Sequence, residues 1–243
     1  MSDFIPPKKH FLHPEVDIIC LVGGKCGSTT LNETFTKNGY KSIKVHSNKD
    51  FIGQFKYDGL IDLINRSSSN KKLYLFDSYR TPIERKISSF FENIHIYIPD
   101  YKNKSCEQLI DIFNTKYLNG IENYHSINSI MKKYGLEPFD TFDFKKRFII
   151  KTKGNLIFVK VLFSDISNWN NILSEIFNRK IILHSRNISS EKIYSSVYDE
   201  FKIKYKTSKS YINNVLKNDR EFRIFNTPDE QNIYINKWSK LTF

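Results

Sequence analysis

The chain has 243 residues, of which 40% are hydrophobic and 15% aromatic, enough for one large domain with a packed core. No apolar run approaches the roughly 18 residues of a membrane-spanning helix, and the N-terminal segment lacks the apolar core of a signal peptide. Three scattered cysteines exclude a disulfide framework and a cysteine-based zinc site. We therefore expect a soluble, cytoplasmic protein with a single domain over residues 1–243 and an irregular lead-in at 1–15.

The formal net charge of +12 suggests a nucleic-acid partner, but the distribution of charge argues against one. Only eight of the 38 basic residues are arginine, and the lysines are spread along the whole chain. Lysines of this kind can cover a solvated surface without any partner. We expect nucleic acid to be an unlikely partner, whereas the positive field favours small anionic ligands.

Predicted strands and helices alternate along the chain. Apolar runs predict strands at 18–22, 41–46, 73–76, 148–150, 156–162 and 181–183. Helical spacing predicts helices that end near 38, span 54–66, run from 82 to 94, form two segments up to 134, and cover 164–178, 211–217 and 229–238. This alternation predicts a three-layer α/β fold in which helices flank a mostly parallel sheet.

The segment at 16–35, VDIICLVGGKCGSTTLNETF, carries the first motif. After the predicted strand, two glycines are followed by a loop that enters a helix, and the loop residues are Lys25, Cys26, Gly27, Ser28, Thr29 and Thr30. Such a turn gathers free backbone N–H groups at the positive end of the helix dipole, and the lysine adds a mobile charge. The motif predicts a phosphate or sulfate site, although an ordinary strand-to-helix turn is the alternative.

The nucleoside-triphosphate P-loop is a competing interpretation of this loop. It requires Gly, four residues and then Gly-Lys-Ser/Thr, whereas Lys25 precedes Gly27 and no Gly-Lys-Ser/Thr follows. The order Lys-x-Gly-Ser/Thr-Thr after a strand instead resembles the 5′-phosphosulfate loop of sulfotransferases that use 3′-phosphoadenosine 5′-phosphosulfate (PAPS).

A second strand-loop-helix, LYLFDSYRTPIERKISSFF at 73–91, carries the second motif. Arg80 and Pro82 form Arg-x-Pro, and Ser88 stands eight residues after the arginine. Arginine binds phosphate bidentately, and a serine on a nearby helical face adds a neutral donor. The segment resembles the 3′-phosphate motif of the same sulfotransferases, and Arg85 matches the version seen in glycan-modifying members. The alternative is that both arginines are ordinary surface residues.

The resemblance implies a P-loop-kinase-like sulfotransferase architecture and transfer of the sulfuryl group from PAPS to an acceptor hydroxyl, expected on a carbohydrate. Lys25 would contact the departing phosphate and the transferred group, residues 26–30 would hold the 5′-phosphate, and Arg80 with Ser88 would hold the 3′-phosphate. Arg186 stands where members of the family place a basic loop over the 3′-phosphate and adenine. The resemblance implies no metal, and the missing membrane anchor suits a microbial or viral enzyme.

Two residues compete for the role of general base. Glu33 follows Lys25 by eight residues, the offset of a catalytic glutamate in some heparan-type sulfotransferases. His46 ends the next predicted strand, at the carboxyl edge where α/β sites form. Two other functions stay open: a nucleotide or small-molecule kinase with a degenerate P-loop, which would need Asp77 to hold Mg²⁺, and a non-catalytic protein that binds an anion or a glycan.

Overall fold

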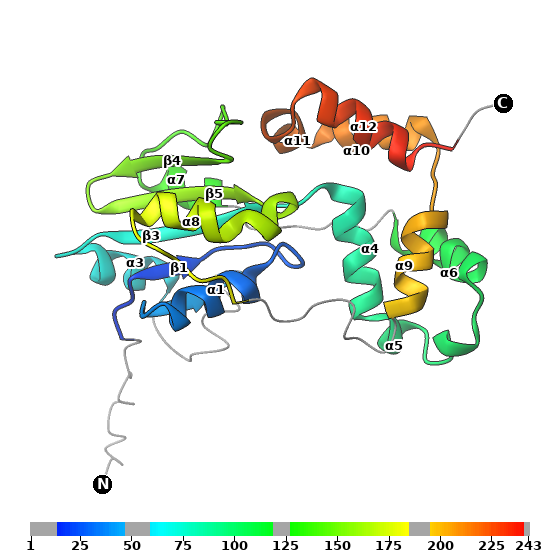
Figure 1. Ribbon diagram of the computed structural model, residues 1–243, viewed down its shortest axis with the longest axis horizontal. Coiled ribbons are helices and arrows are strands. Elements are labelled where there is room, and N and C mark those ends of the chain that lie inside the picture. Colours follow the sequence, from blue (N-terminus) through cyan, green and yellow to red (C-terminus); the bar gives the residue numbers. More distant parts are fainter. Residues whose placement is uncertain (1–13, 47–58, 119–126, 185–194, 241–243) are drawn as a thin grey trace, which may run out of the picture.

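A computed structural model of the chain describes residues 14–46, 59–118, 127–184 and 195–240 (Figure 1). Its strands are β1 (Ile18–Cys20), β2 (Ser42–Lys44), β3 (Leu73–Tyr79), β4 (Phe148–Lys153) and β5 (Leu156–Leu162), and they form one sheet in the order β2-β1-β3-β5-β4. Four strands are parallel, and β4 pairs antiparallel with β5 as a hairpin. The expected mostly parallel α/β sheet is confirmed.

Helices cover both faces of this sheet because successive strand residues point to opposite sides. Ile18 and Cys20 of β1 pack with α1 (Ser28–Lys37) and α8 (Trp169–Phe177). Ile19, between them, belongs to the core on the other side, which includes buried residues of α3 (Leu60–Ser68) and α7 (Ile127–Lys133). The near-continuous apolar runs of the central strands follow from burial on both faces.

The remaining helices lie beyond the carboxyl ends of the strands. Helix α4 (Pro82–Glu92) leaves the end of β3 and runs beside α9, with α6 on the far side of α9 (Figure 1). The others are α5 (Ile94–Tyr97), α6 (Cys106–Ile112) with a following π-helical turn (Phe113–Tyr117), α9 (Ser195–Lys204), α10 (Lys209–Asn218), α11 (Arg220–Phe225) and α12 (Pro228–Trp238).

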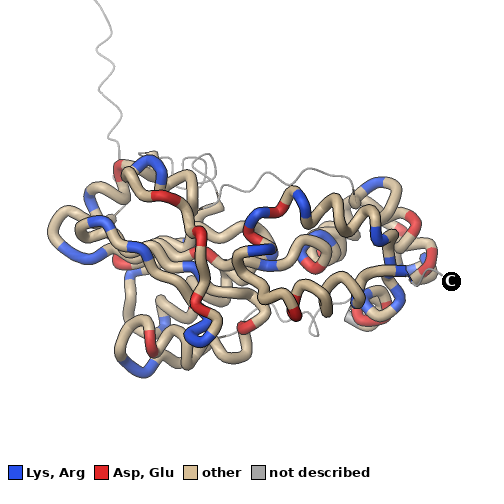
Figure 2. Tube along the Cα trace, turned by 90° about the horizontal axis from the view of Figure 1, so that it is seen from above, with Lys and Arg blue, Asp and Glu red and all other residues tan. Residues whose placement is uncertain are grey.

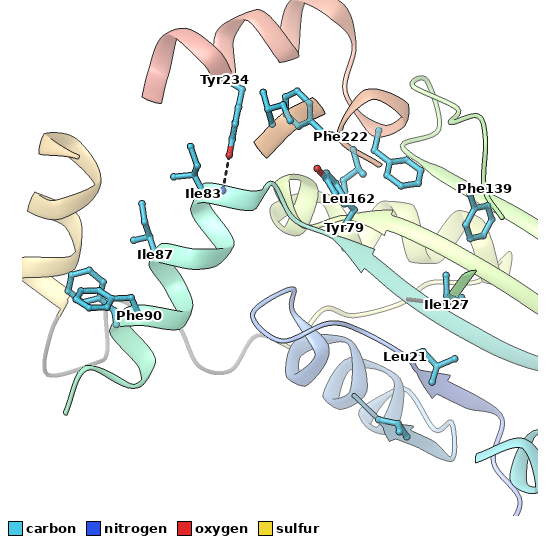
Figure 3. Packing of buried hydrophobic residues seen from close by; sticks show 14 of the residues in the cluster. Leu21, Tyr79, Ile83, Ile87, Phe90, Ile127, Phe139, Leu162, Phe222 and Tyr234 are labelled. Carbon is cyan, nitrogen blue, oxygen red and sulfur yellow. Dashed lines mark hydrogen bonds between the residues drawn. The ribbon is translucent and has the colours of Figure 1, made fainter. Parts of the chain in front are cut away.

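One cluster of buried side chains joins these helices to the sheet. It runs from Leu21 at the end of β1 along Ile87 and Phe90 of α4 to Phe222 of α11 (Figure 3). The hydroxyl of Tyr234 on α12 accepts a hydrogen bond of 2.9 Å from the backbone N–H of Ile83, at the start of α4. This contact fixes α12 against the beginning of α4.

The prediction of a strand at 181–183 is wrong. The backbone N–H groups of this segment donate to side chains of neighbouring helices: Ile181 to Ser174 Oγ at 2.8 Å and Ile182 to Asn38 Oδ1 at 3.0 Å. Because these donors are already used, the segment packs as an extended connection beside α1 and does not pair in the sheet.

Other predicted helices are present in the structure, but they begin or end at different residues. The helix expected at 164–178 begins with a 3-10 turn (Phe163–Asn168) before α8, and the helix expected at 54–66 corresponds to α3, with 54–58 outside the described residues. The helices α9 and α11 were not predicted.

Lys and Arg are distributed over both the sheet and the helices (Figure 2). Within the described ranges, no helix has the length and apolar character needed to cross a bilayer.

Candidate anion-binding site

A pocket with a volume of about 880 Å³ lies where the chain leaves the carboxyl ends of β1, β3 and β5. Parallel α/β sheets commonly bind ligands at this edge. Residues of α4, α9 and α12 complete the wall. Eight residues that the sequence predicts for the site line this one pocket: Lys25, Gly27, Ser28, Thr29, Thr30, His46, Arg80 and Ser88.

The first wall of the pocket is the start of α1. Gly27 is the N-cap residue, with φ of 88°, and it supplies no side-chain cap. The first turn of α1 carries no acidic residue. The first N–H groups of a helix have no intrahelical partner, and the helix dipole makes this end positive. The start of α1 therefore offers backbone donors to an anion, as the loop sequence predicts.

Cys26 lies beneath the loop and does not line the pocket. The residue is 2% exposed, its thiol donates to the carbonyl of Gly24 at 3.5 Å, and its backbone N–H donates to the carbonyl of Gly23 at 3.3 Å. Burial raises the pKa of the thiol to about 11. Cys26 thus holds the shape of the turn rather than facing a ligand.

Arg80 connects the two predicted motifs. Its Nη1 atom donates a hydrogen bond of 2.8 Å to the carbonyl of Lys25, and its guanidinium carbon lies 4.4 Å from the centroid of the Phe163 ring. Lys25 has a φ of 66°, a conformation that non-glycine residues seldom adopt. The loop after β3 therefore supports the loop after β1, 55 positions earlier in the chain.

Two ion pairs lie within the pocket lining, and both involve carboxylates of α4. Lys25 Nζ is 2.9 Å from Glu92 Oε1, and Lys237 Nζ on α12 is 2.7 Å from Glu84 Oε1. Glu84, Glu92 and Lys237 line the pocket but were not predicted as site residues. The two glutamates stand four residues before and after Ser88, a spacing that could have identified them, whereas the position of Lys237 depends on the packing of α12.

The two candidate bases differ in their relation to the pocket. His46 lines it, and its Nδ1 lies 2.7 Å from the carbonyl of Val22 at the end of the β1 segment. Because a carbonyl only accepts hydrogen bonds, Nδ1 carries the proton and Nε2 is left as the basic nitrogen. Glu33, on α1, is partly buried and is not among the described residues that line the pocket.

Asp77, which a kinase would need for Mg²⁺, instead forms a buried ion pair. The residue is 4% exposed, and its Oδ2 lies 2.9 Å from Nζ of Lys160, its direct neighbour on β5. A second carboxylate, Glu221 of α11, lies 2.5 Å from the same Nζ. Burial raises the pKa of Asp77, Lys160 offsets this only in part, and Glu221 adds to it.

For Lys160, the neighbouring charges outweigh the effect of burial on the pKa. Burial by itself would lower its pKa, but Asp77 and Glu221 raise the pKa overall, so the ammonium stays charged. Two carboxylates share one cation, and this cluster joins the sheet to α11. Asp77 is not part of the described pocket lining.

Arg186 lies outside the described residues. Within the described residues, no three or more His, Cys, Asp or Glu side chains come together in a group that could hold a metal ion. Comparison with protein-family models, with curated proteins and with solved structures finds no match for this chain.

Proposed function

We propose that this pocket binds PAPS and transfers its sulfuryl group to an acceptor hydroxyl, with a carbohydrate as the expected acceptor. The observation that carries the proposal is that the two predicted anion motifs line a single pocket and are joined by the bond from Arg80 to the carbonyl of Lys25. A donor with a 5′-phosphosulfate and a 3′-phosphate needs two anion sites in one cavity, and the two motifs supply them.

The charges of the pocket favour such a donor. Among the described residues, the pocket lining contains five Lys and Arg side chains and two carboxylates: Lys25, Lys44, Arg80, Lys202 and Lys237 against Glu84 and Glu92. The N–H groups at the start of α1 add donors that are fixed by the fold. Fixed donors and cations of this kind stabilise charge that develops on a leaving phosphate without having to reorganise.

In the proposed reaction the acceptor oxygen forms a bond to sulfur while the bond from sulfur to the bridging phosphate oxygen breaks. The products are the sulfated acceptor and adenosine 3′,5′-bisphosphate. Lys25 would stabilise the leaving phosphate, and catalysis would consist mainly of in-line positioning and charge stabilisation, as in phosphoryl transfer. The proton of the acceptor hydroxyl would pass to a base.

We propose His46 as that base. It lines the pocket, and the carbonyl of Val22 fixes the tautomer that leaves Nε2 ready to accept a proton. Glu33 lacks the first of these properties. The kinase alternative has no comparable support, because the carboxylate of Asp77 is buried against Lys160.

A thermal-shift titration tests the proposal. Adenosine 3′,5′-bisphosphate should raise the melting temperature of the wild type, because it binds only the folded state, and ATP with Mg²⁺ should do so much less. The shift should disappear in Arg80→Ala. Stabilisation by ATP with Mg²⁺ instead would contradict the proposal in favour of a kinase.

Arg179→Ala is a matched control for Arg80→Ala. Arg179 also donates to a backbone carbonyl, that of Asn38 at 2.6 Å, and also stacks on an aromatic ring, that of Tyr40 at 4.3 Å. It does not line the pocket. The control variant should lose similar local contacts and keep the full response to the bisphosphate; loss of the response in both variants would mean that the effect of Arg80 is general destabilisation.

A further inference from the structure

Helix α4 presents a regular row of polar side chains to the pocket. Glu84, Ser88 and Glu92 follow one another at intervals of four residues, so they lie on one face of the helix, and all three line the pocket. The two carboxylates flank the serine by one helical turn each. On its own this arrangement would repel a phosphate from Ser88.

A lysine from another element compensates each carboxylate. Lys25 reaches Glu92, and Lys237 reaches Glu84 from α12. Lys237 is also well placed by its neighbours, since its Nζ lies 4.6 Å from the ring centroid of Trp238, which is fully buried. The fold therefore keeps two ammonium groups beside the row on α4, one at each end.

Lys237 lies close to the position that the second motif assigns to the 3′-phosphate. Side chains four residues apart on a helix are neighbours, with Cβ atoms about 5–6 Å apart. The ammonium that contacts Glu84 is thus within reach of an anion at Ser88. A lysine side chain is long and flexible, and its charge can move from a carboxylate to a phosphate without any change in the backbone.

We propose that Lys237 is a further ligand-binding residue, which contacts the 3′-phosphate beside Ser88, and that Glu84 is the counter-ion which this phosphate displaces. The inference rests on the proposed function and assigns to α12 a part in nucleotide selection. Because the pair with Glu84 has to be exchanged, a nucleotide that lacks a 3′-phosphate gains nothing from Lys237. The pair therefore selects a 3′,5′-bisphosphate over a 5′-monophosphate.

Calorimetric titration with adenosine 3′,5′-bisphosphate and with adenosine 5′-monophosphate tests this selection. Lys237→Gln should weaken binding of the bisphosphate roughly tenfold or more, the effect of one charged hydrogen bond. It should change binding of the monophosphate by less than about twofold, so the preference for the bisphosphate falls. Glu84→Gln should tighten binding of the bisphosphate, because the phosphate no longer has to displace a carboxylate from Lys237.

Lys204→Gln is the matched control. Lys204 is also a helical lysine paired with glutamates, Glu107 at 2.7 Å and Glu200 at 2.8 Å, and it does not line the pocket. The Lys204→Gln substitution removes the same charge as Lys237→Gln, and it should leave the affinities for the bisphosphate and for the monophosphate unchanged. If Lys237→Gln weakens both ligands equally, or neither, while bisphosphate binding still requires Arg80, this inference is wrong and the proposed function stands. If the wild type does not bind the bisphosphate at all, both are wrong.

Discussion

Gly27 packs so closely against Trp169 that a Cβ atom at this glycine would lie 2.6 Å from Cη2 of the indole ring. The ring cannot easily move away, because Trp169 is fully buried and its Nε1 donates to the carbonyl of Leu162 at 2.9 Å. The first residue of α8 therefore supports the loop that begins α1. The indole ring therefore restricts the backbone of the candidate anion-binding loop.

This contact predicts a large effect of Gly27→Ala. The methyl group would meet the ring, and φ of 88° is a conformation that disfavours alanine. We expect a loss of about 2–4 kcal/mol in the free energy of unfolding, from overpacking and backbone strain together. Denaturant unfolding measures this loss, and binding of adenosine 3′,5′-bisphosphate should weaken with it.

Gly39→Ala separates the effect of backbone strain from the effect of overpacking. Gly39 has the same φ of 88°, but nothing lies within 4 Å of the position that its Cβ would occupy. This variant should lose only about 1 kcal/mol and keep its ligand binding. Equal losses in the two variants would show that the Trp169 ring does not constrain the loop.

The buried cluster around Lys160 predicts a destabilised, pH-sensitive variant. Lys160→Met would leave Asp77 and Glu221 without their cation, at a cost of about 3–5 kcal/mol. Lys151→Met on β4 is the control, because Lys151 and its partner Asp140 are both partly exposed, and we expect a loss of about 0–1 kcal/mol. Chemical denaturation of both variants measures the difference.

The pH dependence of Lys160→Met has a definite sign. Burial and Glu221 already raise the pKa of Asp77 above its ordinary 3.8, and loss of the lysine raises it further. A carboxyl whose pKa is higher in the folded state favours folding when it is protonated, so this stability is lost as the pH rises through the folded-state pKa. The deficit of the variant should grow as the pH rises above the ordinary carboxyl pKa of 3.8; a deficit that shrinks as the pH rises would mean that the carboxylates are not buried together.

Substitution of the two candidate bases should give opposite results. His46→Gln should lower kcat by roughly 10²–10⁴-fold, the usual contribution of a general base, while the affinity for the bisphosphate is unchanged. Glu33→Gln should leave kcat nearly unchanged. Release of adenosine 3′,5′-bisphosphate from PAPS, measured with a panel of carbohydrate acceptors, gives both values, and the reverse pattern would assign the base to Glu33.

Lys25→Ala distinguishes a transferase from a protein that only binds an anion. A transferase should lose turnover by roughly 10²–10³-fold, because the charge that develops on the leaving phosphate is no longer stabilised. The melting temperature should change little, since the ion pair of Lys25 is with Glu92, whose side chain is 41% exposed. A non-catalytic binding function that survives the substitution would contradict the transferase assignment.

The sequence predicts the sheet and both motifs because these features depend on local patterns. The apolar runs that became β1, β3 and β5 are buried on both faces, and each is followed by a short loop into a helix, so Lys25 and Arg80 were expected at the same edge of the sheet. The segment at 181–183 has the same apolar character, but it donates to Ser174 and Asn38, which no local pattern reveals.

The part of the pocket formed by the C-terminal helices could not be predicted in this way. Lys237 reaches Glu84 across 153 positions of sequence, and the contact depends on the packing of α12 against α4, to which the bond between Tyr234 and Ile83 contributes. The Lys160 cluster similarly needs β3, β5 and α11 together. Contacts of this kind follow from packing between distant elements, and one sequence does not specify which charged residues meet.

The most direct test of the proposed function is a structure of the protein determined with adenosine 3′,5′-bisphosphate. We predict that the 5′-phosphate contacts Lys25 and the backbone N–H groups at the start of α1. The 3′-phosphate should lie beside Arg80, Ser88 and Lys237, and the ion pair between Lys237 and Glu84 should be broken. A bisphosphate bound outside this pocket, or bound in it with neither phosphate at the start of α1, would contradict the assignment.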